Sequence, residues 1–374
     1  MKRIIFCGCL LYSTTASMAQ KEPPVKDSFY LLAPVEVRAV RASENAPFTK
    51  TNFSKKEIAA SNLGQDIPFL LTHTPSVVIN SDAGNGVGYT GIRIRGTDAT
   101  RINVTLNGIP YNDAESQGTF FVDLPDFSSS TGSIQIQRGV GSSSNGAGAF
   151  GGSINFSTNE VNPDAYAEIN NSYGSFNTWK HTVKAGSGLV NGFTTELRLS
   201  RISSDGFIDR ACSKLSSFHF TTAYTAARSS VRVNVFSGKE KTYQAWYGVS
   251  EADLKSGNRT INYAGTEKPG EPYENETDNY TQTHYQLFFN HILTKKISFN
   301  TALFLTKGKG YYEQYKAEEE YAQYGMPDPP STGLPITTSD MIRQLWLDND
   351  FYGSIFSFQY KHNKTQATLG GGYT

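Results

Sequence analysis

Hydrophobic and polar positions alternate with a period of two between residues 91 and 158, which indicates a series of short β-strands. The expected buried face of the first two strands comprises Ile92, Ile94, Ile102, Val104 and Leu106. Asn107-Gly108 follows directly and is a strong signal for a two-residue β-hairpin, because both residue types accept positive φ angles. The alternation resumes at residues 134–140 and again at 153–158. The pattern predicts a small domain rich in strands, with a hairpin near its centre.

Two short helical segments are expected before these strands. Ser54 is followed three positions later by Glu57, which is the arrangement of a capping box and predicts a helix that runs to Ala60. Residues 63–71 are predicted to form a second helical or turn segment.

The pattern changes after Thr158 to longer amphipathic strands. Ten are expected, at residues 166–173, 179–185, 193–202, 218–224, 230–236, 280–293, 297–306, 341–352, 355–362 and from about 365 onward. Apolar residues occupy one face and polar residues the other, as where Leu197 and Leu199 oppose Glu196 and Arg198. This distribution is typical of a membrane β-barrel, whose lipid-facing side is apolar and whose interior is polar.

The connections between the expected strands alternate in length. The second, fourth, sixth and eighth are short, the eighth being a predicted turn at Gly353-Ser354, whereas the third, fifth and seventh are long. Short periplasmic turns and long outer loops produce this alternation in a membrane barrel. A soluble sandwich also has hairpins, but it gives no reason for every second connection to be long. The pattern therefore favours an antiparallel transmembrane β-barrel.

The N-terminus has the organisation of a secretory signal peptide. Lys2 and Arg3 precede apolar residues 4–12, and small residues at 17–19 provide a cleavage site, so the mature chain is expected to begin at Gln20. A lipoprotein that is modified at Cys9 is a less favoured alternative. Residues 20–45 are rich in proline and polar residues and are expected to form an extended leader.

Composition narrows the class of protein further. Loss of the two basic residues of the signal leaves 32 Lys and Arg against 34 Asp and Glu, a net charge of −2 from the totals of 34 and 34, which gives no indication of nucleic-acid binding. Cys212 is the only cysteine of the mature chain, which excludes an intramolecular disulfide. Aromatic residues reach 13%, and no apolar run approaches the ~20 residues of a membrane helix.

A literal GxGxxG sequence, the fingerprint of dinucleotide-binding folds, occurs at residues 146–151. Dinucleotide binding requires a helix directly after these glycines, whereas residues 153–158 are predicted to form a strand. No Walker-type motif is present, and none of the six His lies in a nucleophile-bearing motif. We expect no enzymatic activity, no cofactor and no metal site.

Four motifs between residues 63 and 158 resemble the plug domain of TonB-dependent outer-membrane receptors. They are an Ile-Arg-Gly turn at 94–96, a Val-Thr-Leu-Asn-Gly-Ile-Pro hairpin at 104–110, an Ile-Gln-Ile-Gln-Arg-Gly segment at 134–139 and a glycine-rich closing segment at 148–158. The chain departs from the family pattern where Asn107 replaces an Asp, Ser76 replaces a Gly and Asn145 replaces a Tyr. The resemblance implies an α+β plug domain followed by an antiparallel transmembrane β-barrel, located in the cell outer membrane.

The resemblance also divides the chain into four parts. They are a signal peptide at 1–19, a leader at 20–45, a plug domain at 46–160 and a partial barrel at 161–374. Plugged transporters use about 22 strands, and a barrel must close to remove unpaired edges in lipid. We therefore expect the sequence to be the N-terminal part of a longer protein.

The leader contains a segment that resembles the TonB box, which the periplasmic energy-coupling protein TonB captures. Its candidate residues are Leu32, Val35, Glu36, Val37 and Ala39. Valines alternate with charged residues here, which suits addition of a strand to the edge of a partner's sheet. An ordinary linker strand is the alternative interpretation.

Arg95 and Arg138 lie in turns where the plug arginines of the family face carboxylates of the barrel. Such buried ion pairs contribute little stability but serve as registry or switch devices. The resemblance implies that both arginines hold the plug in place, with partners beyond Thr374.

The family places ligand binding at two plug apices, residues 82–90 and 111–121, and in outer loops. The candidate ligand-binding residues are Tyr89, Tyr111, Asn112, Asp113, Glu115, Gln117, Tyr243, Trp246 and Tyr247. Aromatic faces with a few polar groups suit a flat chelate or a sugar ring. Many of the tyrosines can instead belong to an interfacial aromatic girdle.

The expected function is import of a scarce nutrient by energised displacement of the plug, with TonB and outer-membrane lipid as partners. A compact plug with an Asn-Asp-Ala-Glu apex resembles receptors for ferric siderophores or iron–citrate, so an iron chelate is the preferred ligand. Haem, cobalamin and oligosaccharide remain alternatives. A surface receptor that signals or adheres without transport is a different class, and a truncated remnant is a third possibility.

Overall fold

The N-terminal domain, residues 46–157, is built around a mixed sheet of five strands in the order β1-β6-β7-β4-β5. These strands are β1 Lys50–Ser54, β4 Ile102–Leu106, β5 Ile109–Pro110, β6 Ser133–Arg138 and β7 Gly152–Ser157. The pair β4 and β7 is parallel, and the other pairs are antiparallel. The computed structural model describes residues 41–42, 46–141 and 148–374, all within Leu32–Thr374, one of two units of the chain.

Short helices and a second small sheet complete this domain. The helices are α1 Lys55–Ser61 and α2 Ile67–Leu70, with 3₁₀ turns η2 Ala99–Arg101, η3 Phe121–Asp123 and η4 Phe127–Ser130, and the small sheet pairs β2 Val77–Ser81 with β3 Thr90–Ile94. The predicted capping box is confirmed, because the Ser54 hydroxyl accepts from the Glu57 amide while the Glu57 side chain accepts from the Ser54 amide. No helix in the described ranges is long and apolar enough to cross a membrane.

The predicted hairpin at Asn107-Gly108 is also confirmed. It joins β4 to β5, and both residues have positive φ angles, 58° and 84°. The predicted buried face forms the core of the domain, where Ile92, Ile94, Ile102, Val104 and Leu106 are each at most 2% exposed. Strand β7 follows Gly151 directly, so the segment lacks the helix that a dinucleotide site requires.

The rest of the chain forms one antiparallel sheet of nine strands in sequential order. They are β8 Ala165–Gly174, β9 Thr178–Ser187, β10 Phe193–Ser204, β11 Ser213–Thr225, β12 Ser229–Tyr243, β13 Thr277–Thr294, β14 Ile297–Glu320, β15 Thr338–His362 and β16 Thr365–Tyr373. The expected fold class, an α+β domain followed by a large antiparallel sheet, is confirmed.

The prediction of ten strands was wrong at one point, the turn expected at Gly353-Ser354. Strand β15 passes through both residues without interruption, and Gly353 pairs with Phe304 of β14. A Cβ atom at Gly353 would lie 2.2 Å from the carbonyl oxygen of Tyr373. Glycine at this position therefore allows β16 to approach β15 closely. In the sequence, such a glycine cannot be distinguished from one that forms a turn.

The predicted alternation of connection lengths is confirmed after this correction. Short turns lie at 188–192, 226–228, 295–296 and 363–364. Longer loops at 205–212, 244–276 and 321–337 join the strands at the opposite end, where the first connection, 175–177, is short. We call the two ends of the sheet the turn end and the loop end. The loop at 244–276 carries helix α3, Glu251–Ser256, and the loop at 321–337 begins with the 3₁₀ turn η6, Tyr321–Tyr324.

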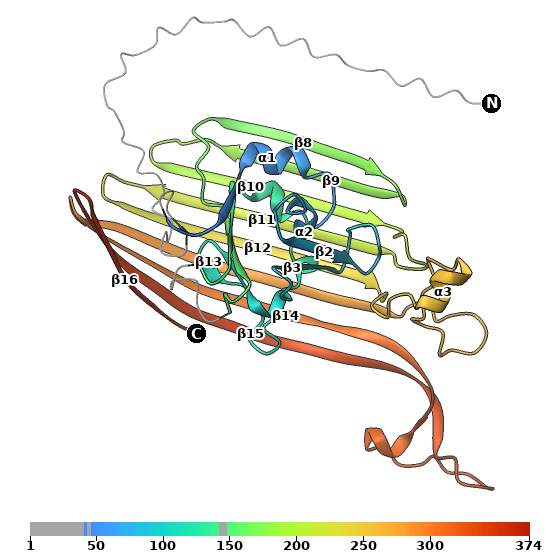
Figure 1. Ribbon diagram of the computed structural model, residues 1–374. Coiled ribbons are helices and arrows are strands. Elements are labelled where there is room, and N and C mark those ends of the chain that lie inside the picture. The colour runs from blue at the N-terminus through green and yellow to red at the C-terminus, as the bar shows by residue number, and fades with distance from the viewer. Residues whose placement is uncertain (1–40, 43–45, 142–147) are drawn as a thin grey trace, which may run out of the picture. The chain divides into compact units, whose positions relative to one another are not determined.

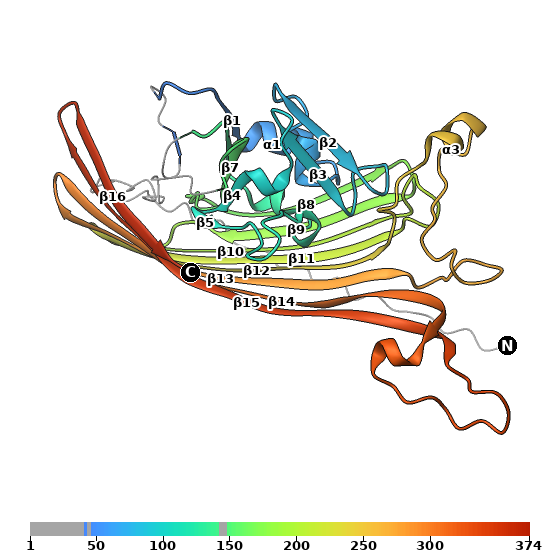
Figure 2. The ribbon, with the colours of Figure 1, turned by 60° about the horizontal axis from the view of Figure 1, so that its bottom comes forward.

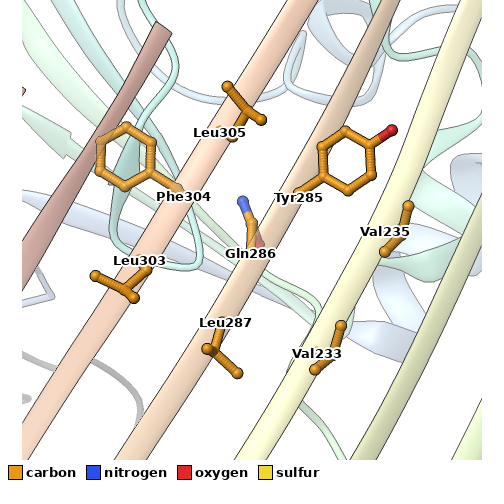
Figure 3. A pocket seen from close by; sticks show the side chains of 8 residues that line it. All are labelled: Val233, Val235, Tyr285, Gln286, Leu287, Leu303, Phe304 and Leu305. Atoms are coloured by element: carbon orange, nitrogen blue, oxygen red, sulfur yellow. The ribbon is translucent and has the colours of Figure 1, made fainter.

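The N-terminal domain lies against one face of the nine-stranded sheet, as Figures 1 and 2 show. We call this the inner face. It is polar, with buried Lys180, Arg198, His219 and Asn234, whereas Leu197, Leu199 and Val231 of the opposite, outer face are exposed. The predicted arrangement of apolar and polar faces is confirmed. The outer face has a hollow of about 270 Å³. Figure 3 shows the side chains that line it, those of Val233, Val235, Tyr285, Gln286, Leu287, Leu303, Phe304 and Leu305.

Candidate functional site

The contact surface between the N-terminal domain and the inner face contains three groups of buried polar side chains. The first group is centred on Asp126, which precedes η4 with a φ of 52°. Its Oδ1 lies 2.7 Å from Nζ of Lys180, and its Oδ2 lies 3.5 Å from Nη1 of Arg198. Thr182 and Ser200 each donate a hydroxyl to Oδ2 over 2.6 Å. One carboxylate of the domain thus meets two cations and two hydroxyls of strands β9 and β10.

The strands present these partners because of their period of two. Lys180, Thr182 and Lys184 alternate along β9, and Arg198 and Ser200 alternate along β10, so all five lie on the inner face. Burial acts to raise the pKa of the Asp126 carboxyl, but the charges of Arg198 and Lys180 outweigh burial and hold that pKa below its usual range. Asp126 is therefore ionised at neutral pH.

The second group consists of carboxyl groups and one tyrosine, without a cation among them. The Tyr89 hydroxyl of the N-terminal domain lies 2.6 Å from Oδ2 of Asp278 and 3.1 Å from Oε1 of Glu240, on strands β13 and β12. Asp123 is 4% exposed, and its Oδ1 has no hydrogen-bond partner among the described residues. Burial, together with the charges of Asp278 and Asp113, raises the pKa of Asp123 well above its usual value.

The third group surrounds the Asn107 hairpin. The Asn107 Oδ1 accepts from the Thr158 amide over 2.8 Å, while its Nδ2 donates to Oε1 of Gln286 on β13 over 3.0 Å. Arg232 of β12 donates to the carbonyl of Asn159 over 2.9 Å. The amide at position 107 both donates and accepts, which a carboxylate cannot do, and so the asparagine suits a glutamine partner.

A row of aromatic rings also crosses this contact surface. Phe236 of β12 belongs to the core cluster of the N-terminal domain, and its ring centroid lies 5.3 Å from that of Phe127. His219 and His284 occupy the opposite positions on the two neighbouring strands and stack on Phe236 at 5.5 and 4.5 Å. The apolar core of the domain therefore continues into the sheet.

Comparison with known families identifies the N-terminal domain. The family described as TonB-dependent Receptor Plug Domain matches residues 42–153. These residues form a TonB-dependent receptor plug domain. The plug resemblance seen in the sequence is confirmed, and the plug domain here is followed by part of the antiparallel sheet that such receptors close into a barrel.

Solved structures share this combination of plug domain and sheet. The ferric-catecholate import receptor Fiu from Escherichia coli K12 matches at 15% identity with a TM-score of 0.61, over 87% of this chain and 48% of Fiu. The siderophore receptor PiuA from Acinetobacter baumannii matches at 14% with a TM-score of 0.64, over 89% and 46%. The ferric citrate transporter FecA matches at 17% with a TM-score of 0.59, over 87% and 46%. This chain thus spans about half the length of these receptors, and no curated protein matches it.

The two predicted plug arginines lie in the Ile-Arg-Gly turn, which contains Arg95, and at the end of β6, which is Arg138. Arg95 is exposed with a φ of 53°, and Arg138 donates to the carbonyl of Pro75 over 3.3 Å. Within the described residues neither arginine forms an ion pair. Their expected pairing with carboxylates of the barrel stays a prediction.

The structure places the candidate ligand residues of the plug domain in two environments. Tyr89 contacts Glu240 and Asp278, and Tyr111 donates its hydroxyl to the carbonyl of Phe120 over 2.6 Å. The apex residues Asn112 and Asp113 stabilise their own loop: Asn112 bonds the backbone of Ile102, Val104 and Gln117, and Asp113 accepts from the amides of Glu115 and Ser116. Glu115 and Gln117 are exposed at the tip.

The three candidates from the loop end also differ from one another. Tyr243 is 6% exposed and donates its hydroxyl to the carbonyl of Tyr273 over 2.6 Å, so it supports the loop at 244–276. Trp246 and Tyr247 are 40% and 55% exposed, and Trp246 contacts the ring of Tyr312 at 5.9 Å. No hydrogen bond or ring contact within the described part of the chain joins Trp246 or Tyr247 to the apex at 111–121.

Two other expectations concern the N-terminal segment and the absence of a metal site. The TonB-box residues Leu32, Val35, Glu36, Val37 and Ala39, and the signal peptide, lie outside the described residues. Across the described ranges, no group of three or more His, Cys, Asp and Glu side chains is arranged to hold a metal ion.

Sequence reasoning missed Asp126 and its partners. A signal was available, because Lys180, Lys184 and Arg198 occupy the face of their strands that the barrel pattern assigns to the interior. Lys184 pairs with Glu196 of the sheet itself, whereas Lys180 and Arg198 meet an anion of the plug domain. Nothing local distinguishes Asp126 from the other carboxylates of the plug domain.

Proposed function

We propose that this chain is the plug domain and first part of the barrel of an outer-membrane receptor that imports a scarce nutrient. The preferred ligand is a ferric siderophore or another iron chelate. The observation that carries the proposal is the contact surface itself: buried hydrogen bonds and ion pairs seat the plug domain on the inner face, beside apolar contacts such as that of Phe127 with Phe236.

The many polar groups of this contact surface suit a plug that must be displaced. Replacing a buried ion pair by packed apolar residues often leaves the free energy of unfolding unchanged or increases it. Pairs such as Asp126–Lys180 therefore fix the position of the plug domain on the sheet more than they stabilise the fold. Water can solvate the separated groups when the plug domain moves. Capture of residues 32–39 by TonB would supply the force, since a strand added to a partner's sheet is held by backbone hydrogen bonds.

The ligand class is proposed from two features. Fiu and FecA, which the fold resembles, are described as receptors for ferric catecholate and ferric citrate. Exposed Trp246, Tyr247, Glu115 and Gln117 offer aromatic faces and polar groups that suit a chelate. Haem, cobalamin and oligosaccharide are the alternative ligands.

The decisive experiment measures uptake of radioactive iron, presented as several chelates, by cells that make the protein with or without residues 32–39. Deletion of residues 24–31, of equal length, is the matched control. Accumulation of one chelate that requires residues 32–39 but not 24–31 supports an energised iron importer and identifies its ligand. Binding that persists without any accumulation would instead support a surface receptor.

Arg95 and Arg138 are proposed to hold the plug domain through carboxylates of the remaining barrel. Alanine at both positions should increase hydrogen exchange of the plug amides and alter uptake. Unchanged exchange and unchanged uptake in the double variant would contradict this role.

A further inference from the structure

Six cations form a continuous group on the outer face of the sheet, toward its loop end. This group, which we call the basic belt, comprises Arg201, Lys214, Lys239, Lys241, Lys307 and Lys309. All six side chains are exposed. They come from β10, β11, β12 and β14, four of five consecutive strands, and the fifth strand, β13, contributes Thr281 and Asn279 at the same level.

Strand register brings the cations together. Arg201 lies opposite Ser216, Ser216 opposite Lys239, Lys239 opposite Thr281 and Thr281 opposite Lys309. In the adjacent row, Lys214 lies directly opposite Lys241. Like charges in directly opposite positions destabilise a sheet unless anions are present.

The protein neutralises only part of this charge. Lys307 and Lys309 pair with Asp350 and Asp348 of β15 at 2.8 and 2.7 Å. Within the described residues, Arg201, Lys214 and Lys239 have neither an ion pair nor a hydrogen-bond partner. Lys241 donates only to an amide oxygen, that of Asn275, over 2.8 Å.

The belt borders the apolar part of the outer face, and Lys307 lies in the same row as Leu199 and Phe218. One step toward the turn end from Arg201 and Ser216 lie Leu199 and Phe218, and one further step leads to Leu197, Phe220 and the hollow of Figure 3. The row of Lys214 and Lys241 also holds Trp179 and the tilted ring pair Tyr311–Trp346, whose centroids lie 4.7 Å apart. Aromatic side chains at the edge of an apolar band are typical of a membrane interface.

We propose that the basic belt binds the phosphate-bearing headgroups of an anionic lipid in the membrane leaflet at the loop end. The inference rests on the proposed membrane location of the sheet. In this arrangement the cations would contact the phosphate of a lipid headgroup, and the adjacent apolar band would contact the acyl chains of the same lipid. The lipid anions would also relieve the repulsion between Lys214 and Lys241.

The test compares two variants of the full protein in detergent, each with four cations neutralised. The belt variant combines Arg201→Gln, Lys214→Gln, Lys239→Gln and Lys241→Gln. The control variant combines Arg228→Gln, Lys295→Gln, Lys296→Gln and Lys364→Gln near the turn end, which removes the same residue types. Native mass spectrometry measures binding of phosphatidylglycerol against phosphatidylcholine, at fixed ionic strength because surface charges are screened by salt.

We expect the wild type and the control variant to prefer phosphatidylglycerol by at least about tenfold and the belt variant to lose most of that preference, since each cation near a lipid surface contributes a severalfold effect. An unchanged preference in the belt variant, or an equal loss in the control, would overturn the proposal. Displacement of the lipid by millimolar inorganic phosphate would overturn the assignment to a lipid.

A further variant separates loss of charge from loss of folding. Lys214→Arg, Lys239→Arg and Lys241→Arg together retain the charge and should retain the lipid preference. Failure of the proposed iron uptake leaves this binding result unaffected, because the assay contains neither iron nor TonB. Loss of preference in the arginine variant would count against a role of charge.

Discussion

Oδ1 of Asp126 in the plug domain lies 2.7 Å from Nζ of Lys180 on strand β9, and their side chains are 0% and 4% exposed. This pair has the opposite polarity to the one expected from the sequence, because the plug domain supplies the carboxylate and the sheet supplies the cation. The pair is held further by hydroxyls of Thr182 and Ser200. It attaches the plug domain to the first strands of the sheet.

Replacing Asp126 by Asn should loosen this attachment. Lys180 and Arg198 would remain buried without an anion, and breaking a buried pair from one side costs about 3–5 kcal/mol. Hydrogen exchange of the amides of η4 should increase accordingly. Glu251→Gln, which removes an exposed partner of Lys255, is the control and should change the free energy of opening little.

The double variant Asp126→Asn with Lys180→Met tests whether the two side chains act as a pair. We expect the second substitution to recover part of the loss, since it removes an uncompensated charge. Simple addition of the two single effects would show that the side chains act independently.

Stability of the plug domain near α2 should fall as the pH rises. Burial raises the pKa of Asp66 to about 8 from 3.8, while Thr90 donates to its carboxyl over 3.1 Å. Because the folded state holds this proton more tightly, its stabilising contribution is complete below about pH 4. It is lost as the pH rises toward 8, by a few kcal/mol in order of magnitude.

Local hydrogen exchange, corrected for intrinsic rates between pH 5 and 8, measures this effect at the amides around α2. Asp66→Asn keeps an oxygen that can accept from Thr90 and should make local stability nearly independent of pH. Asp164→Asn, at an exposed position, is the control. A steep pH dependence in the Asp66→Asn protein would refute the assignment.

Tyr89→Phe should weaken the seating of the apex at 82–90. The substitution removes the hydroxyl that contacts Asp278 and Glu240, and an intramolecular hydrogen bond contributes about 0.5–1.5 kcal/mol net. Hydrogen exchange in β3 reports the change. Tyr247→Phe, whose ring is exposed at the loop end, should leave that exchange unaltered.

His219→Phe should maintain or increase the stability of the protein. Both ring nitrogens of His219 are buried without a hydrogen-bond partner among the described residues, and an unsatisfied buried polar group costs about 1–3 kcal/mol. A phenyl ring preserves the stacking on Phe236. Thermal unfolding in detergent provides the measurement, with His181→Phe on the outer face for comparison, and a clear loss of stability would indicate an unrecognised partner of His219.

Features that depend on neighbouring residues could be predicted from the sequence, whereas features that depend on distant residues could not. The capping box at Ser54 and the hairpin at Asn107 depend on neighbouring residues, so the sequence predicted both. The prediction of a turn at Gly353-Ser354 was wrong because Gly353 allows the neighbouring strand to approach closely and does not reverse the direction of the chain. A glycine that permits a turn and a glycine that permits close approach look alike in the sequence.

The sequence by itself determined most of the elements and the polar and apolar faces of the strands, because these follow from spacing within a few residues, and its four motifs indicated the plug domain. Only the tertiary structure decided which buried groups meet. Asp126 and Arg198 are separated by 72 positions, and the basic belt arises from the register of neighbouring strands. Contacts of this kind depend on how the plug domain docks and how the strands align, which no local pattern encodes.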